Sequence, residues 1–414
     1  MDPQQRLLLE RGYSALHAAG MSRGALMGAV VAVSGGQWAS EFQVMLGRTP
    51  AGRSVYASTG FSCSVTCGRV SFVLGLQGAC ASYDTACSAS LVANHGSVRA
   101  LQGRECDAAL SAGVNMILDA AAMAGNAVAG FTSVRGRSHT FDARADGYAR
   151  GEAIDAFGCR LGDAAVAVGL SGSAVRQDGR SASLTAPNGQ AQQGVLAASL
   201  ADAGLAAEGL VLLEAHGTGT ALGDPIEAGA VAAVLLGQRT SCQLVVGSLK
   251  ANAGHTEPGA GLAGALKLMM QLRGGMESPN AQLRALNPHV GATLRGRMGC
   301  TLPTEVGDLL GREHVASGGV SSFGYAGTIA HAVMRHAWRA GHESSVPPTR
   351  FGLKRRPFLW IDDVATTFAE LTGLYTTCWP LMHPASDAAE RRACLLVGAR
   401  GAARSDGAPS AARP

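Results

Sequence analysis

The chain has 414 residues, of which 47% are hydrophobic and 15% are charged, and its formal net charge at pH 7 is +4. This composition describes a soluble globular protein that can bury a large core, and so small a net charge gives no reason to expect binding to nucleic acid or to a membrane surface. The longest uncharged apolar runs, at 24–33 and 228–237, are about half as long as a bilayer-spanning helix. No membrane span is therefore predicted.

The N-terminus shows no targeting segment, and the cysteines indicate a reducing compartment. No signal or transit peptide is recognisable, because Asp2 and Glu10 flank the first short apolar segment. The 10 cysteines form no CxxC pair and no regular spacing, which favours free thiols over a disulfide framework. Cys63 and Cys67 lack a second pair of ligands, so no metal site is predicted. We expect a cytoplasmic protein, or a plastid protein if a transit peptide once preceded the chain.

The first quarter of the chain predicts alternating helices and strands. Residues 1–20 read as a helix, 24–35 as a core strand, and 61–78 as a helix and turn. Residues 78–85 have the small and β-branched side chains of a short buried strand, and residues 88–101 carry apolar side chains at helical spacing.

Cys87 lies between this last strand and helix. The unpaired N–H groups of the first helical turn would face its sulfur, and the positive end of the helix dipole lowers a thiol pKa and favours the nucleophilic thiolate. From this stretch alone, a structural buried cysteine is the commoner case. The histidines further along the chain favour the nucleophile.

The middle of the chain continues the pattern. Residues 106–118 predict a strand, 163–179 another strand, and 190–205 a helix. Between them, residues 141–153 form a turn-rich loop with three acidic side chains. Because their spacing does not follow a calcium-binding loop, we interpret it as a structural loop whose Asp side chains bond to backbone N–H groups and to Arg144 or Arg150.

Two histidines occupy equivalent places in the second half. His216 follows the apolar strand that begins at Leu210, and His255 follows the one that begins at Leu244; a Gly-rich entry into a helix comes after each. Loops at one edge of an α/β sheet converge on a site. One cysteine and two histidines are the side chains of an acyl-transfer site.

Two neighbouring patterns have structural interpretations. Asp224 suits a helix N-cap, with Pro225 at the first helical position and Glu227 completing a capping box, so these residues would position His216. The glycines at 259, 261 and 264 spell GxGxxG, but the acidic residue of a dinucleotide site is absent about twenty residues further on. We therefore reject a dinucleotide site.

At these motifs the chain resembles the β-ketoacyl synthase family, and most closely the ketosynthase domains of modular (type I) polyketide synthases. The resemblance rests on DTACSASL around Cys87, EAHGTGTALGDPIE around His216 and SLKANAGHTEPGAG around His255, with FDARADGYARGEA and SSFGYAGTIAH as further signatures. It implies an α/β thiolase-like fold, with two similar halves in five α-β-α-β-α layers. Since the family's opening strand and helix are not recognisable here, we expect the N-terminal half to lack elements.

The resemblance also implies a role for each site residue. Cys87 would carry the acyl group, and His216 and His255 would donate hydrogen bonds to the enolate of a malonyl thioester. Lys250 would support the histidine loop, while the backbone N–H groups of Cys87 and Tyr325 would hold the oxyanion. The substrate-binding candidates are Thr218 and Thr220, for which a simple turn-forming role is an equally open alternative, and Phe323.

The same resemblance implies the partners and the domain division. We expect substrates on the phosphopantetheine of an acyl carrier protein, no cofactor bound by this chain itself, a homodimer, and acyltransferase and other synthase domains supplied elsewhere. The ketosynthase domain would cover residues 1–338, with halves of about 1–160 and 161–338. A linker at 339–383 and a disordered tail at 384–414 would follow.

The predicted function is decarboxylative Claisen condensation in polyketide biosynthesis. A fatty-acid chain-elongating synthase is the alternative within the same class. A catalytically silent dimerisation or carrier-docking fragment is the alternative from another class, because elements of the N-terminal half are missing.

Overall fold

The computed structural model describes residues 1–337, except 39–40, 163–167, 238, 240–242, 295–298 and 310–314. All described residues belong to one unit, Met1–His342. The predicted linker at 339–383 and tail at 384–414 lie outside the described residues, and the domain division stays a prediction.

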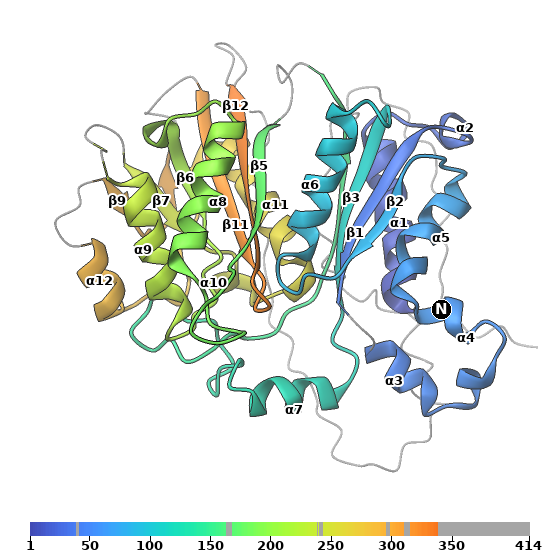
Figure 1. Cartoon of the computed structure of the whole chain (residues 1–414), viewed down its shortest axis with the longest axis horizontal. Coiled ribbons are helices and arrows are strands. Elements are labelled where there is room, and N and C mark those ends of the chain that lie inside the picture. Colours follow the sequence, from blue (N-terminus) through green and yellow to red (C-terminus); the bar gives the residue numbers. More distant parts are fainter. Residues whose placement is uncertain are drawn as a thin grey trace, which may run out of the picture. The chain divides into compact units, whose positions relative to one another are not determined.

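A four-stranded sheet forms the centre of the N-terminal half (Figure 1). Strand β1 pairs in parallel with β2 and β3, and β3 pairs antiparallel with β4. Along β1, Val31 and Val33 pack into one core cluster and Ala32 into another, because alternate side chains of a strand point to opposite faces. The strands in spatial order are β2 (Cys80–Tyr83), β1 (Val31–Gln37), β3 (Ala108–Asn115) and β4 (Ala153–Cys159).

A six-stranded sheet forms the centre of the C-terminal half and repeats this pattern. Strand β6 pairs in parallel with β7 and β11, and β11 pairs antiparallel with β12, as β1 does with β2 and β3 and as β3 does with β4. Strand β12 has β5 on its far side, whereas β4 pairs only with β3 among the described residues. The order is β5 (Gly169–Gln177), β12 (Thr328–Ala337), β11 (Val315–Phe323), β6 (Leu210–Glu214), β7 (Leu244–Gly247) and β9 (Cys300–Thr301).

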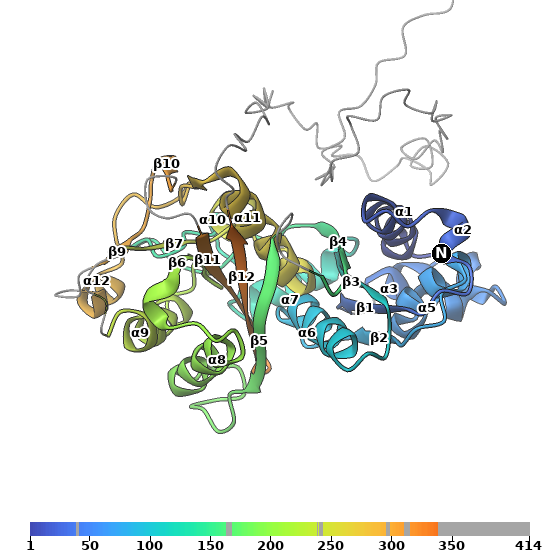
Figure 2. The same cartoon turned by 90° about the horizontal axis from the view of Figure 1, so that it is seen from above.

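Helices cover both faces of each sheet, and this confirms the predicted five layers. The helices α6 (Ala89–Gln102) and α11 (Ala260–Gly274) contact strands of both sheets and form the middle layer (Figure 2). The outer helices are α1 (Pro3–Ala18) and α5 (Cys63–Leu74) on the N-terminal sheet, and α8 (Gly189–Asp202) and α9 (Gly223–Leu235) on the C-terminal sheet.

Glycine allows the two middle helices to approach each other closely. A Cβ atom at Gly261 would lie 2.7 Å from Leu91 Cβ, which real side chains do not tolerate. A Cβ atom at Gly259 or Gly264 would lie 3.2 Å from Ala153 Cβ or 3.0 Å from Glu214 Cγ, so the glycines of the GxGxxG pattern allow this segment to pack closely against α6 and the strands.

Shorter elements complete the chain. Strands β8 (Met276–Glu277) and β10 (Gly307–Asp308) pair antiparallel. The remaining helices are α2 (Arg23–Leu26), α3 (Glu41–Gly47), α4 (Ala57–Phe61), α7 (Ala120–Val128), α10 (Lys250–Ala253) and α12 (Pro288–Leu294), and the 3-10 turns are η1 (Pro50–Arg53), η2 (Ala207–Gly209) and η3 (Glu257–Gly259). Across the described part of the chain, none of the helices combines the length and the apolar character needed to span a bilayer.

Two strand predictions need correction. The segment 24–35 begins as the short helix α2, which Ser22 caps through its hydroxyl, so the strand starts only at Val31. Strand β2 was expected to be buried, but it lies at the edge of its sheet and Cys80 is exposed. Small residues in a short run fit an edge strand as well as a central one.

The acidic loop at 141–153 is structural, as predicted. Asp142 is fully buried and accepts hydrogen bonds from the backbone N–H groups of Arg144, Arg284 and Ala285, and its carboxylate also pairs with the Arg144 guanidinium at 2.7 Å. These bonds hold the pKa of Asp142 well below its usual range, although burial opposes them. The loop therefore joins the two halves through a carboxylate that stays charged.

Asp155 on β4 makes the stability of the protein depend on pH. It is 9% exposed, and its Oδ2 has no hydrogen-bond partner among the described residues. Burial raises its pKa to about 8. Because the folded protein holds this proton more tightly than the unfolded chain does, stability is lost as pH rises from about 4 towards 8.

We predict that Asp155→Asn removes this loss. Between pH 6 and pH 8.5, the wild-type free energy of unfolding should fall by about 1–3 kcal/mol more than that of the variant. Urea denaturation of both proteins at the two pH values measures the difference. Identical pH dependence of the two proteins would contradict the assignment.

Candidate active site

Cys87 lies at the sharp turn between β2 and α6. The preceding Ala86 has φ +54°, a left-handed conformation that few residues other than glycine adopt. Cys87 is 5% exposed, and the backbone N–H groups of Cys87 and Tyr325 both point at its sulfur. Its carbonyl oxygen accepts a hydrogen bond of 2.7 Å from Ser322 Oγ. The turn therefore presents the sulfur beside two backbone donors.

One predicted histidine, His255, contacts this sulfur, and the other, His216, contacts the His255 ring. Strands β6 and β7 are neighbours in the sheet, so the loops after their carboxyl ends lie side by side. His255 Nε2 is 3.1 Å from Cys87 Sγ. The rings of His216 and His255 stand edge to face with 5.7 Å between their centroids. The structure therefore brings Cys87, His216 and His255 together, as the sequence predicted.

Backbone hydrogen bonds assign the same tautomer to both histidines. The N–H of Glu257 donates to His255 Nδ1 at 3.1 Å, and the N–H of Phe323 donates to His216 Nδ1 at 3.3 Å. Each Nδ1 is therefore an acceptor, so the proton of each neutral ring is on Nε2. Burial lowers the pKa of both histidines well below the usual value, and the charge of Lys250 lowers it further. Both rings are thus neutral donors.

The expected thiolate at rest is wrong for this closed site. Burial raises the pKa of Cys87 to about 12, and the negative charge of Glu257 adds to the effect. The charge of Lys250 and the two backbone N–H groups at the sulfur act in the opposite direction but are weaker. Desolvation outweighs the helix terminus because the sulfur is cut off from water. The neutral thiol is the resting form.

Asp224 and Glu227 hold the His216 loop, although not as a helix cap. Helix α9 already begins at Gly223, so the predicted N-cap and capping box are wrong. The Glu227 carboxylate instead accepts the N–H groups of His216 and Gly217 at 2.7 and 2.8 Å. Asp224 accepts the N–H of Gly219 at 3.0 Å. Their predicted function of positioning His216 is confirmed.

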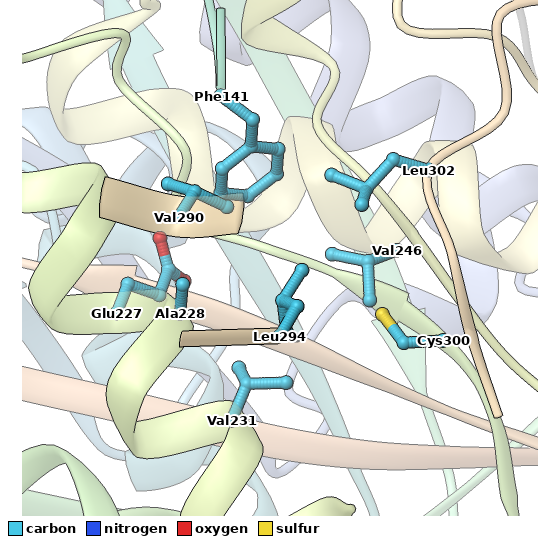
Figure 3. A pocket seen from close by; sticks show the side chains of 9 residues that line it. All are labelled: Phe141, Glu227, Ala228, Val231, Val246, Val290, Leu294, Cys300 and Leu302. Atoms are coloured by element: carbon cyan, nitrogen blue, oxygen red, sulfur yellow. The ribbon is translucent and has the colours of Figure 1, made fainter. Parts of the chain in front are cut away.

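A small apolar cavity lies behind Glu227 (Figure 3). Its volume is about 10 Å³, and Phe141, Val231 and Val290 are among the side chains that line it. This is room for about one water molecule and not for an acyl chain. The apolar surroundings explain why burial raises the pKa of Glu227 to about 7.

Lys250 and a second lysine, Lys267, belong to one buried charge network. Lys250 is 5% exposed, and burial lowers its pKa while the carboxylates of Glu214 and Glu227 act in the opposite direction. Glu214 pairs with Lys267 Nζ at 2.6 Å and accepts the N–H of Leu249, the residue before Lys250. Sequence reasoning missed the Glu214–Lys267 pair. Because lysine is rare in this chain, the presence of Lys267 was a signal in the sequence that could have pointed to this pair.

The remaining predicted residues line the same region. Phe323 is 7% exposed, and its ring centroid is 5.4 Å from that of His216. Thr220 Oγ1 accepts the N–H of Gly223 at 3.2 Å and lies 3.1 Å from Thr218 Oγ1, which is the turn-forming arrangement. Binding of a substrate by these threonines stays a prediction. Within the described ranges, no group of three or more His, Cys, Asp or Glu side chains is placed to hold a metal ion.

The comparisons with known proteins agree with this geometry. Residues 1–157 match the N-terminal domain of the β-ketoacyl synthases, and residues 167–284 match the C-terminal domain of the same family. The chain therefore belongs to the β-ketoacyl synthase family.

The relatives are polyketide synthases. The chain is 40% identical over 343 residues to one component of the phenolphthiocerol/phthiocerol polyketide synthase of Mycobacterium tuberculosis, a match that covers 81% of this chain and 18% of that protein. It is 41% identical over 349 residues to another component of the same synthase, a match that covers 81% of this chain and 16% of that protein. The chain thus spans less than a fifth of the length of these two relatives.

Solved ketosynthases share the thiolase-like fold. The ketosynthase from module 6 of the bacillaene synthase of Bacillus subtilis 168 has a TM-score of 0.74 and 30% identity, covering 81% of this chain and 60% of that one. The oxazolomycin ketosynthase domain of Streptomyces albus JA3453 has a TM-score of 0.76 and 31% identity, covering 83% and 62%. The predicted family and fold are both confirmed.

We predict that Lys267→Met destabilises the protein by about 3 kcal/mol, because it removes the ion-pair partner of the buried Glu214 carboxylate. The matched control is Arg6→Met, which breaks the exposed Arg6–Glu10 pair (3.6 Å) on α1 and should cost less than about 0.5 kcal/mol. Urea unfolding of both variants gives the two values. Equal, small losses would contradict the importance of the buried pair.

Proposed function

We propose that the chain is the ketosynthase of a polyketide synthase, which condenses an acyl group on Cys87 with a malonyl unit on an acyl carrier protein. One observation carries the proposal: the Cys87 sulfur accepts two backbone N–H groups and is 3.1 Å from the Nε2 of His255, whose ring contacts that of His216. The polyketide synthase relatives support this pathway over fatty-acid elongation.

The first step transfers the acyl group to the enzyme. Cys87 sulfur attacks the carbonyl carbon of the acyl thioester, a carbon–sulfur bond to Cys87 forms, and the carrier thiol leaves with the proton that the Cys87 thiol gives up. The carbonyl oxygen becomes an oxyanion during the attack. The N–H groups of Cys87 and Tyr325, which already face the sulfur, are its donors.

The second step forms the enolate. The malonyl thioester loses carbon dioxide, and the electrons of the broken carbon–carbon bond move onto the thioester oxygen. The Nε2–H groups of His216 and His255 donate to that oxygen. Preorganised donors of this kind stabilise a developing oxyanion by about 3–4 kcal/mol each.

The third step joins the two units. The nucleophilic carbon attacks the acyl carbonyl on Cys87, a carbon–carbon bond forms, and the carbon–sulfur bond to Cys87 breaks, so that Cys87 leaves as a thiolate and takes a proton from water to return to the resting thiol. The same two backbone N–H groups hold the oxyanion. Neutral histidines suit the second and third steps, because imidazolium ions would protonate the enolate.

The substrates would arrive on the phosphopantetheine arm of a carrier protein, and the malonyl unit would be loaded by an acyltransferase elsewhere in the synthase. Thr218 and Thr220 are the candidate contacts for the arm, since both are on the loop after His216. Lys250 would hold this loop and the His255 loop in register through its charge.

The same assembly would be a homodimer. Phe72 on α5 is 87% exposed, Val73 is 40% exposed, and both are on the helix that packs behind the edge strand β2. An exposed apolar patch beside an open strand edge is typical of an interface.

We predict that Cys87→Ala abolishes acylation. Intact-protein mass after incubation with a short acyl thioester should show one added acyl group on the wild type and none on the variant. A wild-type chain that folds cooperatively but is never acylated would favour the silent-module alternative.

We further predict that His216→Ala keeps acylation and lowers the rate of condensation with a malonyl thioester by about 100-fold or more, because one enolate donor is lost. Single-turnover product analysis on the pre-acylated protein separates the two steps. An equal loss of both steps would argue against the assigned role of His216.

A further inference from the structure

Glu257, two residues after His255, has an unusual backbone conformation. Its φ of +49° lies in the left-handed region, which residues with a side chain rarely adopt. This conformation directs its N–H at His255 Nδ1, at 3.1 Å. The assigned Nε2–H tautomer of His255 therefore depends on a strained residue that something must hold in place.

A buried ion pair holds Glu257. Its side chain is fully buried, and both of its oxygens accept hydrogen bonds of 2.8 Å from the Arg150 guanidinium, whose side chain is 3% exposed. Asn115 Nδ2 donates to the same carboxylate at 3.1 Å. A bidentate guanidinium fixes both the position and the orientation of a carboxylate.

The backbone of Arg150 is tied to His255 as well. His255 N–H donates to the carbonyl of Ala149, and Gly151 N–H donates to the carbonyl of His255, both at 2.7 Å. Arg150 and His255 are therefore opposite each other in a short parallel bridge. A displacement of the Arg150 segment would displace His255 directly.

The network continues to a third residue, Glu41, at the start of α3. Arg150 Nη2 donates to Glu41 Oε1 at 2.7 Å. The other Glu41 oxygen accepts the N–H groups of Leu118 and Asp119, each at 2.7 Å. These two residues immediately precede α7, a helix of which no residue is buried. The network thus connects the His255 loop to the start of α7.

We propose that Arg150, Glu257 and Glu41 form a positioning network that keeps His255 in the Nε2–H form, 3.1 Å from Cys87 Sγ. The inference rests on the proposed function, because the donor form of His255 matters only for a reaction that needs a donor. Arg150 is a positioning residue, since it acts through Glu257 and the backbone of the bridge.

The charges around His255 give the proposal a distinctive pH signature. Cys87, Tyr148 and His216 contact the His255 ring, Arg150 and Lys250 act on it through their charges, and Glu257 reaches it with its backbone N–H. Burial and the positive charges of Lys250 and Arg150 lower the pKa of His255, so removing the Arg150 charge raises that pKa and favours the imidazolium. The acid limb of the condensation rate should then move to higher pH.

The test compares Arg150→Met with the wild type and with Arg99→Met, which breaks the Arg99–Asp202 pair (2.8 Å) between α6 and α8. We expect Arg150→Met to be acylated at Cys87 within about threefold of the wild-type rate, to condense at least 30-fold more slowly, and to show the shifted acid limb. Arg150→Lys keeps the charge and should restore the acid limb but only part of the rate. Arg99→Met should match the wild type.

A spectroscopic measurement tests the tautomer of His255 without relying on activity, which a misfolded variant would also lose. Nitrogen NMR of histidine-labelled protein reports which ring nitrogen carries the proton, and His216 serves as the internal control. His255 should be the Nε2–H form in the wild type and a mixture of forms in Arg150→Met, while His216 stays unchanged.

A second variant separates backbone strain from the side-chain anchor. Glu257→Gly relieves the left-handed conformation but removes the partner of Arg150. We expect it to lose condensation as Arg150→Met does.

Wild-type condensation in Glu257→Gly, or equal losses of acylation and condensation in a folded Arg150→Met, would overturn the proposal. A wild-type chain that cannot acylate Cys87 would overturn the proposed function and this inference with it, whereas an active wild type beside an unaffected Arg150→Met would overturn the inference alone.

Discussion

The close packing of α6 against α11 is the contact on which the site depends. Cys87 lies two residues before the start of α6, and His255 lies a short turn before α11, so the separation of these helices sets the distance from sulfur to imidazole. Gly261 has no side chain to keep Leu91 away, and Ser90 Oγ accepts the N–H of Leu262 at 3.1 Å to fix the register. A larger residue at Gly261 would separate the nucleophile from its histidine.

Burial then decides the protonation of the site. Cys87 and His255 are almost completely removed from water and His216 is partly buried, which makes their charged forms unfavourable. The groups that remain charged nearby occur with opposite charges beside them, as in Lys267 with Glu214 and Arg150 with Glu257. The result is a neutral thiol beside two neutral donors, with charge confined to a surrounding layer that positions them.

Carboxylates are the means of positioning. Glu227 accepts the N–H groups of the His216 loop, Glu214 that of the residue before Lys250, and Glu257 is held by Arg150 beside His255. The segments that carry His216, Lys250 and His255 are therefore each fixed through a buried carboxylate. Within the described residues, no group of three or more His, Cys, Asp or Glu side chains is placed to hold a metal ion. Because an acceptor with two oxygens can fix two donors at once, a few acidic residues determine the geometry of a site built from loops.

The sequence by itself determined which side chains are candidates for the site. Cys87, His216 and His255 are recognisable because each follows a strand and precedes a helix, which are local patterns, whereas the α/β layers followed from the resemblance to the β-ketoacyl synthases. The tertiary structure alone decided the protonation of Cys87, the exposure of β2 and the ion pairs of Lys267 and Arg150. In both ion pairs the partner is remote in the sequence: Glu257 is 107 residues from Arg150, and Lys267 is 53 residues from Glu214. Desolvation and long-range pairing arise only when separate segments exclude water together, so no local pattern of residues carries them.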